Sequence, residues 1–154
     1  VDPDSLADVA TVQGIITAIR RIRADMEISP RVPIRLRSKN VTRLVDHGDA
    51  LRDLAGVAQV EEGERDGPVS TFVVAGSTFF VPLDGVVDVT AERARLDKVI
   101  GKVEKDAGFL EKKLSNSNFT DRAPAHVVSE IREKHTAAQE RLERLREART
   151  GLET

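Results

Sequence analysis

The chain has 154 residues, which is enough for one ordinary domain or for a small domain with an extended arm. Its 24 Lys and Arg residues against 26 Asp and Glu residues give a formal net charge of −2, so no global positive charge marks it as a nucleic-acid binder. The composition excludes a disordered or membrane-spanning chain, and the absence of Cys excludes disulfide scaffolds, thiolate zinc sites and cysteine nucleophiles.

The charges and the helix-breaking residues are unevenly distributed. Residues 1–89 carry 10 basic and 14 acidic side chains, whereas residues 90–154 carry 14 basic and 12 acidic ones. All six Pro and nine of the ten Gly precede residue 125. This distribution predicts a compact N-terminal part followed by a helical arm. Because the chain begins with Val1 and not with Met, we expect it to be a piece of a longer protein.

The first predicted element is an amphipathic helix from Ser5 to Met26. Its apolar residues recur at helical spacing: Leu6, Val9, Val12, Ile16, Ile19, Ile22 and Met26. The same spacing leaves three cations on the opposite face, namely Arg20, Arg21 and Arg23. Pro30 ends the segment, and we assign residues 1–30 to this helical part.

A strand and a second helix are predicted next. Val32–Arg37 alternates apolar and polar residues like a half-buried strand, and Pro33 favours a sheet edge or the start of the strand. Asn40 then caps an amphipathic helix that Gly56 ends. The apolar residues of this helix are Val41, Leu44, Val45, Leu51 and Leu54. Gly48 in its middle argues against one unbroken helix.

Three further strands complete the N-terminal part. Val57–Glu62 is followed by Val69–Val74 and Thr78–Leu83, and the last two flank the turn Ala75-Gly76-Ser77 as in a β-hairpin. Residues 31–89 are therefore predicted to form a small mixed α/β domain of the α+β class, with helices over one face of a sheet that contains the hairpin.

Beyond Thr90 the pattern changes to heptads. The apolar positions are Leu96, Ile100, Val103, Ala107, Leu110 and Leu114, and then Val128, Ile131, His135, Ala138, Leu142 and Leu145. Pro124 fits the first turn of the second helix. Because the polar connector Ser115–Ala123 is short, the two helices must run antiparallel if they pair. Residues 90–154 thus predict a long antiparallel two-helix coiled-coil hairpin.

The charges of the two arm helices predict how they pair. One antiparallel register aligns opposite charges and apolar core residues at the same time. It pairs Asp97 with Arg146, Glu111 with Arg132 and Asp106 with Arg141, and it packs Val103 on Leu142 and Ala107 on Ala138. Lys113 opposite Lys134 is its one like-charge pair. Exposed ion pairs contribute only about 0.2–1 kcal/mol each, so these charges select the register more than they stabilise it.

The outward face of the first arm helix carries five cations that we call the basic row. One aromatic ring lies among them, and the set reads Arg95, Lys98, Lys102, Lys105, Phe109 and Lys112. The equivalent positions of the second helix are acidic: Glu133, Glu140 and Glu147. One cation per turn with an interleaved ring is typical of a surface that binds a phosphate backbone. Lys and Arg also simply solvate the outside of many coiled coils, but the separation of sign between the helices favours binding.

No catalytic or metal-ligating residue is predicted. His47, His126 and His135 have no further ligand at metal spacing, and His135 falls on the heptad seam as a packed core histidine. No glycine-rich phosphate loop and no nucleophile motif is present. The carboxylates lie on solvated helix faces or in the loop Glu61–Asp66.

Three stretches in collinear order resemble the C-terminal end of valyl-tRNA synthetases. Gly14–Pro30 (GIITAIRRIRADMEISP) is similar to the helix that ends their anticodon-binding helical bundle, and Val81–Lys98 (VPLDGVVDVTAERARLDK) to the entry into their coiled coil. Lys113–Lys134 (KLSNSNFTDRAPAHVVSEIREK) is similar to the hairpin tip, where LSN-x-x-F followed by AP-x-x-VV is most diagnostic. Departures from the family pattern are Gly108, Phe109 and Ile131.

The resemblance implies a parent class I synthetase that uses ATP to join valine to its tRNA. The class I signatures are absent from this sequence, so we expect no catalytic site and no cofactor in it. The resemblance also implies a coiled coil that lies against the outer corner of the tRNA, where the D and T loops meet. We therefore predict phosphate contacts from the basic row (Arg95, Lys98, Lys102, Lys105 and Lys112), a stacking or packing role for Phe109, and a contact from Arg122 at the tip.

The expected partners are valine-accepting tRNA and the remainder of the synthetase chain, for a cytoplasmic monomer that binds no membrane. An alternative from a different class is a structural coiled-coil module that self-associates or braces another protein. That module would dimerise with rising concentration and would not bind tRNA. A dimer formed through the helix of residues 5–26 would not support this alternative. It would result from the loss of a neighbouring helical bundle, which would expose the apolar surface of that helix.

Overall fold

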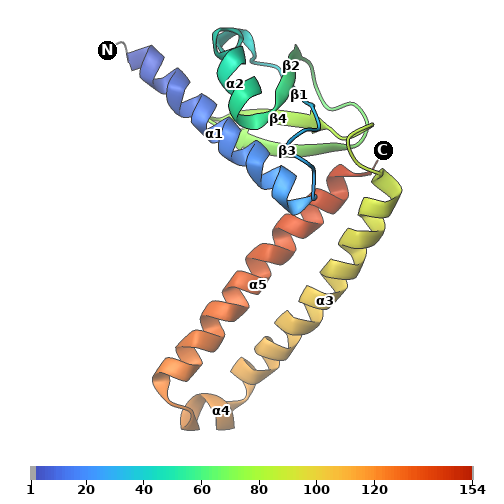
Figure 1. Cartoon of the computed structure of the whole chain (residues 1–154). Helices are drawn as coiled ribbons and strands as arrows, with labels where there is room; N and C mark the ends of the chain where they lie inside the picture. The colour runs from blue at the N-terminus through green and yellow to red at the C-terminus, as the bar shows by residue number, and fades with distance from the viewer. Residues whose placement is uncertain (1–2, 154) are drawn as a thin grey trace. The chain divides into compact units, whose positions relative to one another are not determined.

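The computed structural model describes residues 3–153, and the chain divides into two compact units (Figure 1). Unit 1 consists of Val1–Glu92 together with Gly151–Thr154, and unit 2 is Arg93–Thr150. The chain therefore leaves unit 1 after Glu92 and returns to it after Thr150. The predicted three-part division, with boundaries after residues 30 and 89, stays a prediction.

Unit 1 contains a mixed four-stranded sheet and its helices. In chain order these are α1 (Pro3–Asp25), β1 (Ile34–Ser38), the 3₁₀-helix η1 (Thr42–His47), α2 (Gly48–Ala55), β2 (Val57–Glu62), β3 (Val69–Val74) and β4 (Ser77–Pro82). The strand order is β2-β1-β4-β3, with β1 parallel to β2 and the other pairs antiparallel. The predicted α+β class is confirmed.

The β3–β4 hairpin follows from its turn residues. Ala75 and Gly76 both have positive φ, 52° and 75°, as a two-residue turn of type I′ requires. Pro33 immediately precedes β1, where its missing N–H costs no ladder hydrogen bond. β1 is an interior strand of the sheet. Of the two positions predicted for Pro33, the start of a strand is therefore confirmed and the sheet edge is wrong.

Helices α1 and α2 pack on one face of the sheet (Figure 1). The strictly alternating burial of β1 shows which face this is, since Ile34, Leu36 and Ser38 are buried and Arg35 is exposed. The core consists of fully buried apolar side chains from helices and strands: Ile15, Ile19, Leu51, Ile34, Leu36, Phe79 and Val81. Phe72 stacks on Phe79 with ring centroids 5.3 Å apart.

The placement of Arg23 on the outer face of the first helix was wrong. Arg20 and Arg21 are exposed, but Arg23 is 7% exposed and binds backbone carbonyls at the end of α2. Its Nε donates to the carbonyl of Ala55 at 3.1 Å, and its Nη1 donates to the carbonyl of Ser29 at 2.6 Å. A helix C-terminus leaves carbonyls without partners, and Arg23 supplies donors to them.

The predicted second helix is two elements, not one. The chain forms η1 and then α2, which begins at Gly48, the residue that argued against an unbroken helix. Asn40 is not its cap, because Val41 occupies that position and makes no side-chain capping bond. Val45 and Leu54 are exposed and contribute nothing to the core. Gly56 ends α2 in the left-handed conformation as predicted, with φ 71°.

The arm region forms three helices. These are α3 (Val89–Ser115), the short α4 (Ser117–Arg122) and α5 (Ala125–Gly151). The sequence predicts Ser115–Ala123 only as a short polar connector; in the structure α3 extends to Ser115 and α4 fills most of the rest. Asn116 makes this possible, because its Oδ1 accepts a hydrogen bond from the N–H of Asn118 at 3.0 Å and caps α4. Pro124 directly precedes α5, and its carbonyl accepts the first turn's bonds.

In unit 2, α3 and α5 share one apolar cluster. Val103, Ala107 and Leu142 are buried, and the half-buried residues packed on them are Val99, Ile100, Ala138 and Leu145. Among the tip-side seam residues, Val128 is buried, and four are half-buried: Leu110, Leu114, Ile131 and His135. The shared apolar cluster therefore lies in the middle of the seam.

The predicted ion-pair partner of Asp97 was wrong. Asp97 Oδ1 lies 2.8 Å from Nε of Arg149, not beside Arg146. Arg146 binds Glu104 instead, with Nη2 3.3 Å from Oε1. A heptad position tells which face of a helix a side chain lies on. Because a long arginine side chain can reach about one helical turn along the neighbouring helix, the heptad position alone does not determine its ion-pair partner.

The last residues of the chain pack within unit 1. Leu152 is fully buried, and Arg65 Nη2 donates to the carbonyl of Glu153 at 2.7 Å. Gly151 passes so close to the carbonyl of Val69 that an added Cβ would overlap it. Gly151–Glu153 are thus grouped with unit 1.

Candidate nucleic-acid interface

The unbroken helix α3 determines where the basic row lies. Because α3 runs from Val89 to Ser115 without interruption, residues spaced by three and four positions share one face. Four members of the basic row are exposed on it: Lys98, Lys102, Lys105 and Lys112. Arg95 is half-buried and makes further contacts. Phe109, within the row, is 65% exposed, an unusual surface position for an aromatic ring.

Two of the five acidic side chains of α3 bind arginines of the other long helix. Asp97 and Glu104 bind arginines of α5. Across residues 3–153, no carboxylate lies within ion-pair distance of the exposed lysines Lys98, Lys102, Lys105 or Lys112. Asp106 is the nearest acidic residue in helical spacing, four positions after Lys102. The ammonium groups are therefore free to bind an anion.

Arg122 belongs to a different element from the basic row. It is exposed in the last turn of α4. The structure thus brings four lysines and Phe109 together on α3 and leaves Arg122 on the connector.

Sequence reasoning missed a cluster at the α3–α4 junction. Lys113 Nζ lies 5.6 Å from the ring centroid of Phe109 and 5.5 Å from that of Phe119, within the range of cation–π attraction for both rings. The four-residue spacing of Phe109 and Lys113 was a signal for one contact. The contact with Phe119 needs the helix α4, to which the sequence interpretation assigned no secondary structure beyond a polar connector. We call Phe109, Lys113 and Phe119 the tip cluster.

His135 and the other possible metal ligands form no metal site within residues 3–153. His135 is half-buried, not in the core as predicted, and its Nε2 lies 3.3 Å from the Nε2 of Gln139. Nowhere among residues 3–153 do three or more His, Asp or Glu side chains group as a metal would require. Within that same range no helix is both long and apolar enough to cross a bilayer.

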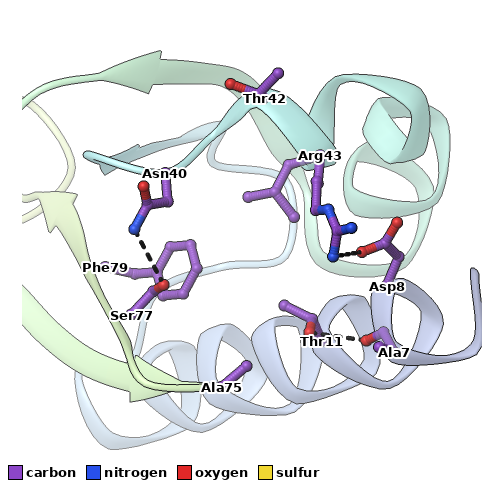
Figure 2. Close-up of a pocket in the computed structure, with 10 residues that line it drawn as sticks. Ala7, Asp8, Thr11, Asn40, Thr42, Arg43, Ala75, Ser77 and Phe79 are labelled. Carbon is purple, nitrogen blue, oxygen red and sulfur yellow. Dashed lines mark hydrogen bonds and ion pairs between the residues drawn. The ribbon is translucent and has the colours of Figure 1, made fainter. Parts of the chain in front are cut away.

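A pocket of about 390 Å³ lies in unit 1 and is lined by residues of α1, η1 and the β3–β4 hairpin (Figure 2). Its two charged groups bind each other, since Arg43 Nη1 lies 3.3 Å from Asp8 Oδ1. Asn40 Nδ2 and Ser77 Oγ are 3.4 Å apart across another part of its wall. No paired acid and base and no activated nucleophile results from this arrangement.

Comparison with known proteins gives a family match for the helical region of the chain. Residues 88–153 match the family model described as the valyl tRNA synthetase tRNA binding arm. The match includes all of unit 2, and with it the basic row and the tip cluster. This region is therefore a domain of the tRNA-binding-arm class.

Relatives extend the match to most of the chain. Valine–tRNA ligases of Streptomyces avermitilis (39% identity, 90% of this chain), Bradyrhizobium diazoefficiens (37%, 96%) and Nitratidesulfovibrio vulgaris (38%, 92%) are similar to it. The chain spans only 16% of the length of each. It belongs to the valyl-tRNA synthetase family, as a segment that includes the tRNA-binding arm.

Proposed function

We propose that this chain is a tRNA-binding appendage of a valine–tRNA ligase and that the basic row on α3 contacts the phosphate backbone of the tRNA. The observation that carries the proposal is the row of four exposed lysines without ion-pair partners, in the region that matches a tRNA-binding arm. An ammonium group gains from a phosphate contact when no carboxylate competes for it. The catalytic reaction with ATP and valine belongs, in this proposal, to parts of the ligase outside these residues.

We further propose that α3 and α5 pair as an antiparallel coiled-coil hairpin that projects this row toward the outer corner of the tRNA. The shared apolar cluster of Val103, Ala107 and Leu142 supports the pairing, as do the two ion pairs between the helices. The outer corner as the contact region comes from the family resemblance. Phosphate contacts carry no base sequence, so we expect valine tRNA and other tRNAs to bind this segment similarly.

The alternative of a self-associating structural module has less support. The family match is to an arm that binds tRNA, and the exposed face of α3 carries like charges that would repel a second copy. We expect the segment to remain monomeric.

The test is filter binding of the chain to valine tRNA and to an unrelated tRNA over a salt series. Lys98, Lys102 and Lys105 are replaced together by Glu. The control replaces Arg132, Lys134 and Arg144 of α5 by Glu, which changes the net charge by the same amount on the other helix. We expect the α3 variant to lose at least tenfold in affinity and to show a shallower salt dependence, because each phosphate contact contributes roughly 0.7–0.9 to the slope.

The control variant should lose clearly less affinity than the α3 variant. Equal losses would show that total charge decides binding and would remove the basic row from the proposal. Unchanged binding in the α3 variant would contradict the proposal directly.

A further inference from the structure

The five phenylalanines of the chain fall into two groups. Phe72, Phe79 and Phe80 lie in β3 and β4, where two of them stack in the core of unit 1. Phe109 and Phe119 belong to the tip cluster of unit 2. Among the described residues of unit 2, Phe109 is the one large apolar side chain that is strongly exposed, at 65%.

The surroundings of Phe109 on α3 are cationic. Its helical neighbours three and four residues away are Lys105, Asp106, Lys112 and Lys113. Three of the four are lysines, and Lys113 lies against the ring. An exposed ring within such a group is the combination by which proteins bind single-stranded nucleic acid, because the ring stacks on a base while the cations bind the backbone.

The tip cluster is held by backbone hydrogen bonds and not by loop contacts alone. Phe119 lies inside α4, where its N–H donates to the carbonyl of Asn116 at 3.0 Å and its carbonyl accepts from the N–H of Ala123 at 2.8 Å. Phe119 is half-buried, so a structural contact with Lys113 accounts for it. The same explanation does not account for Phe109, whose ring remains mostly exposed.

We propose that the tip cluster is a stacking site for an unpaired nucleobase, with Phe109 as the platform and Lys113 as the cation beside it. The inference rests on the proposed function, which supplies RNA as the ligand, and adds a contact that phosphate binding by the basic row does not require. It distinguishes RNA with accessible bases from a fully paired helix. Lys105 and Lys112 bind the phosphates that flank the stacked base.

The chain contains no Trp or Tyr, so one introduced Trp reports on its own surroundings. Phe109→Trp places that reporter in the tip cluster and keeps an aromatic platform. Leu54→Trp, at a position 52% exposed in unit 1, is the control. We expect oligoadenylate to quench the fluorescence of Phe109→Trp strongly. A blunt RNA duplex should quench it little, and neither RNA should quench the control.

Affinity provides the second measurement. Phe109→Leu keeps an apolar side chain and a good helix former but removes the π face. We expect it to lower the affinity for oligoadenylate roughly tenfold and to leave duplex affinity within about twofold. The triple lysine variant should lower both affinities.

The outcomes separate this inference from the proposed function. If tRNA and duplex bind through the lysines but Phe109→Leu binds oligoadenylate like the unaltered chain, the stacking site is wrong and the proposed function stands. Equal quenching of Phe109→Trp by duplex and oligoadenylate would also overturn it. If the unaltered chain binds none of the three RNAs, both proposals fail.

Discussion

At the scale of single residues, Arg23 shows how one buried charge joins two helices. Its guanidinium donates to the carbonyls of Ser29, Ala55 and Gly56, and its bonds to Ala55 are buried. Burial lowers the pKa of Arg23, because removal from water disfavours the charged form. The carbonyls at the end of α2, where the helix dipole is negative, compensate part of that cost.

We expect Arg23→Met to lower the free energy of unfolding by about 2–4 kcal/mol, since it removes the donors of the buried Ala55 carbonyl and of the part-buried Ser29 and Gly56 carbonyls. The matched control is Arg21→Met on the same helix, which removes an exposed arginine and should change stability by no more than about 0.5 kcal/mol. Urea denaturation followed by circular dichroism measures both. Equal effects of the two substitutions would show that the carbonyl contacts of Arg23 contribute little.

Arg23 also shows that the burial of a side chain cannot be predicted from its helical spacing alone. An arginine three residues after Arg20 on a periodic helix looks solvated, because helical spacing alone assigns it to the polar face. The partners that reverse this are carbonyls more than 30 residues away in sequence, and carbonyl positions have no sequence signature. Asn40 was a converse error, since Asn is a strong capping residue that here bonds instead to Ser77.

At the scale of secondary-structure elements, the sequence predicted most of what the structure contains. The first helix, the β strands and the long helices were expected from periodicity, and the hairpin from its turn residues. The differences concern short elements: η1 was predicted as part of one longer helix with α2, and α4 was not predicted as a helix. Both have only six residues, too few for a periodic pattern to register, and neighbouring structure decides their conformation.

The pairing of α3 with α5 yields a prediction about ion pairs. A double-mutant cycle on Asp97 and Arg149 should give a coupling free energy of about 0.2–1 kcal/mol, typical of exposed pairs. The same cycle on Asp97 and Arg146, the pair that heptad positions favoured, should give a value near zero. Alanine substitutions and thermal unfolding by circular dichroism supply the data. Larger coupling between Asp97 and Arg146 would show that the heptad register holds in solution.

The basic row was predictable at this same scale, because it needs only one continuous helix. Every member lies on α3, so the spacing in sequence becomes a face without any tertiary information. The tip cluster needed more, since Phe119 comes from α4 and reaches Lys113 only when the connector is helical. Sites on one element can be read from sequence, whereas sites that combine elements require the fold.

At the scale of the whole molecule, unit 1 is discontinuous in sequence. It includes residues that follow the entire helical region, and Leu152 among them is fully buried. The close approach of Gly151 to the carbonyl of Val69 leaves no room for a side chain there. The segment after Thr150 is therefore part of the fold of unit 1 and not a free end of the arm.

We expect Leu152→Ala to lower the free energy of unfolding by about 2–5 kcal/mol, the usual range for truncating a buried leucine. Leu54→Ala makes the same chemical change at an exposed position and should cost less than about 1 kcal/mol. Hydrogen exchange would locate the effect, with faster exchange of the β3 and β4 amides and little change at residues 98–112 of α3. If Leu152→Ala were no more harmful than Leu54→Ala, the burial of Leu152 would not stabilise unit 1, and the sheet would fold without it.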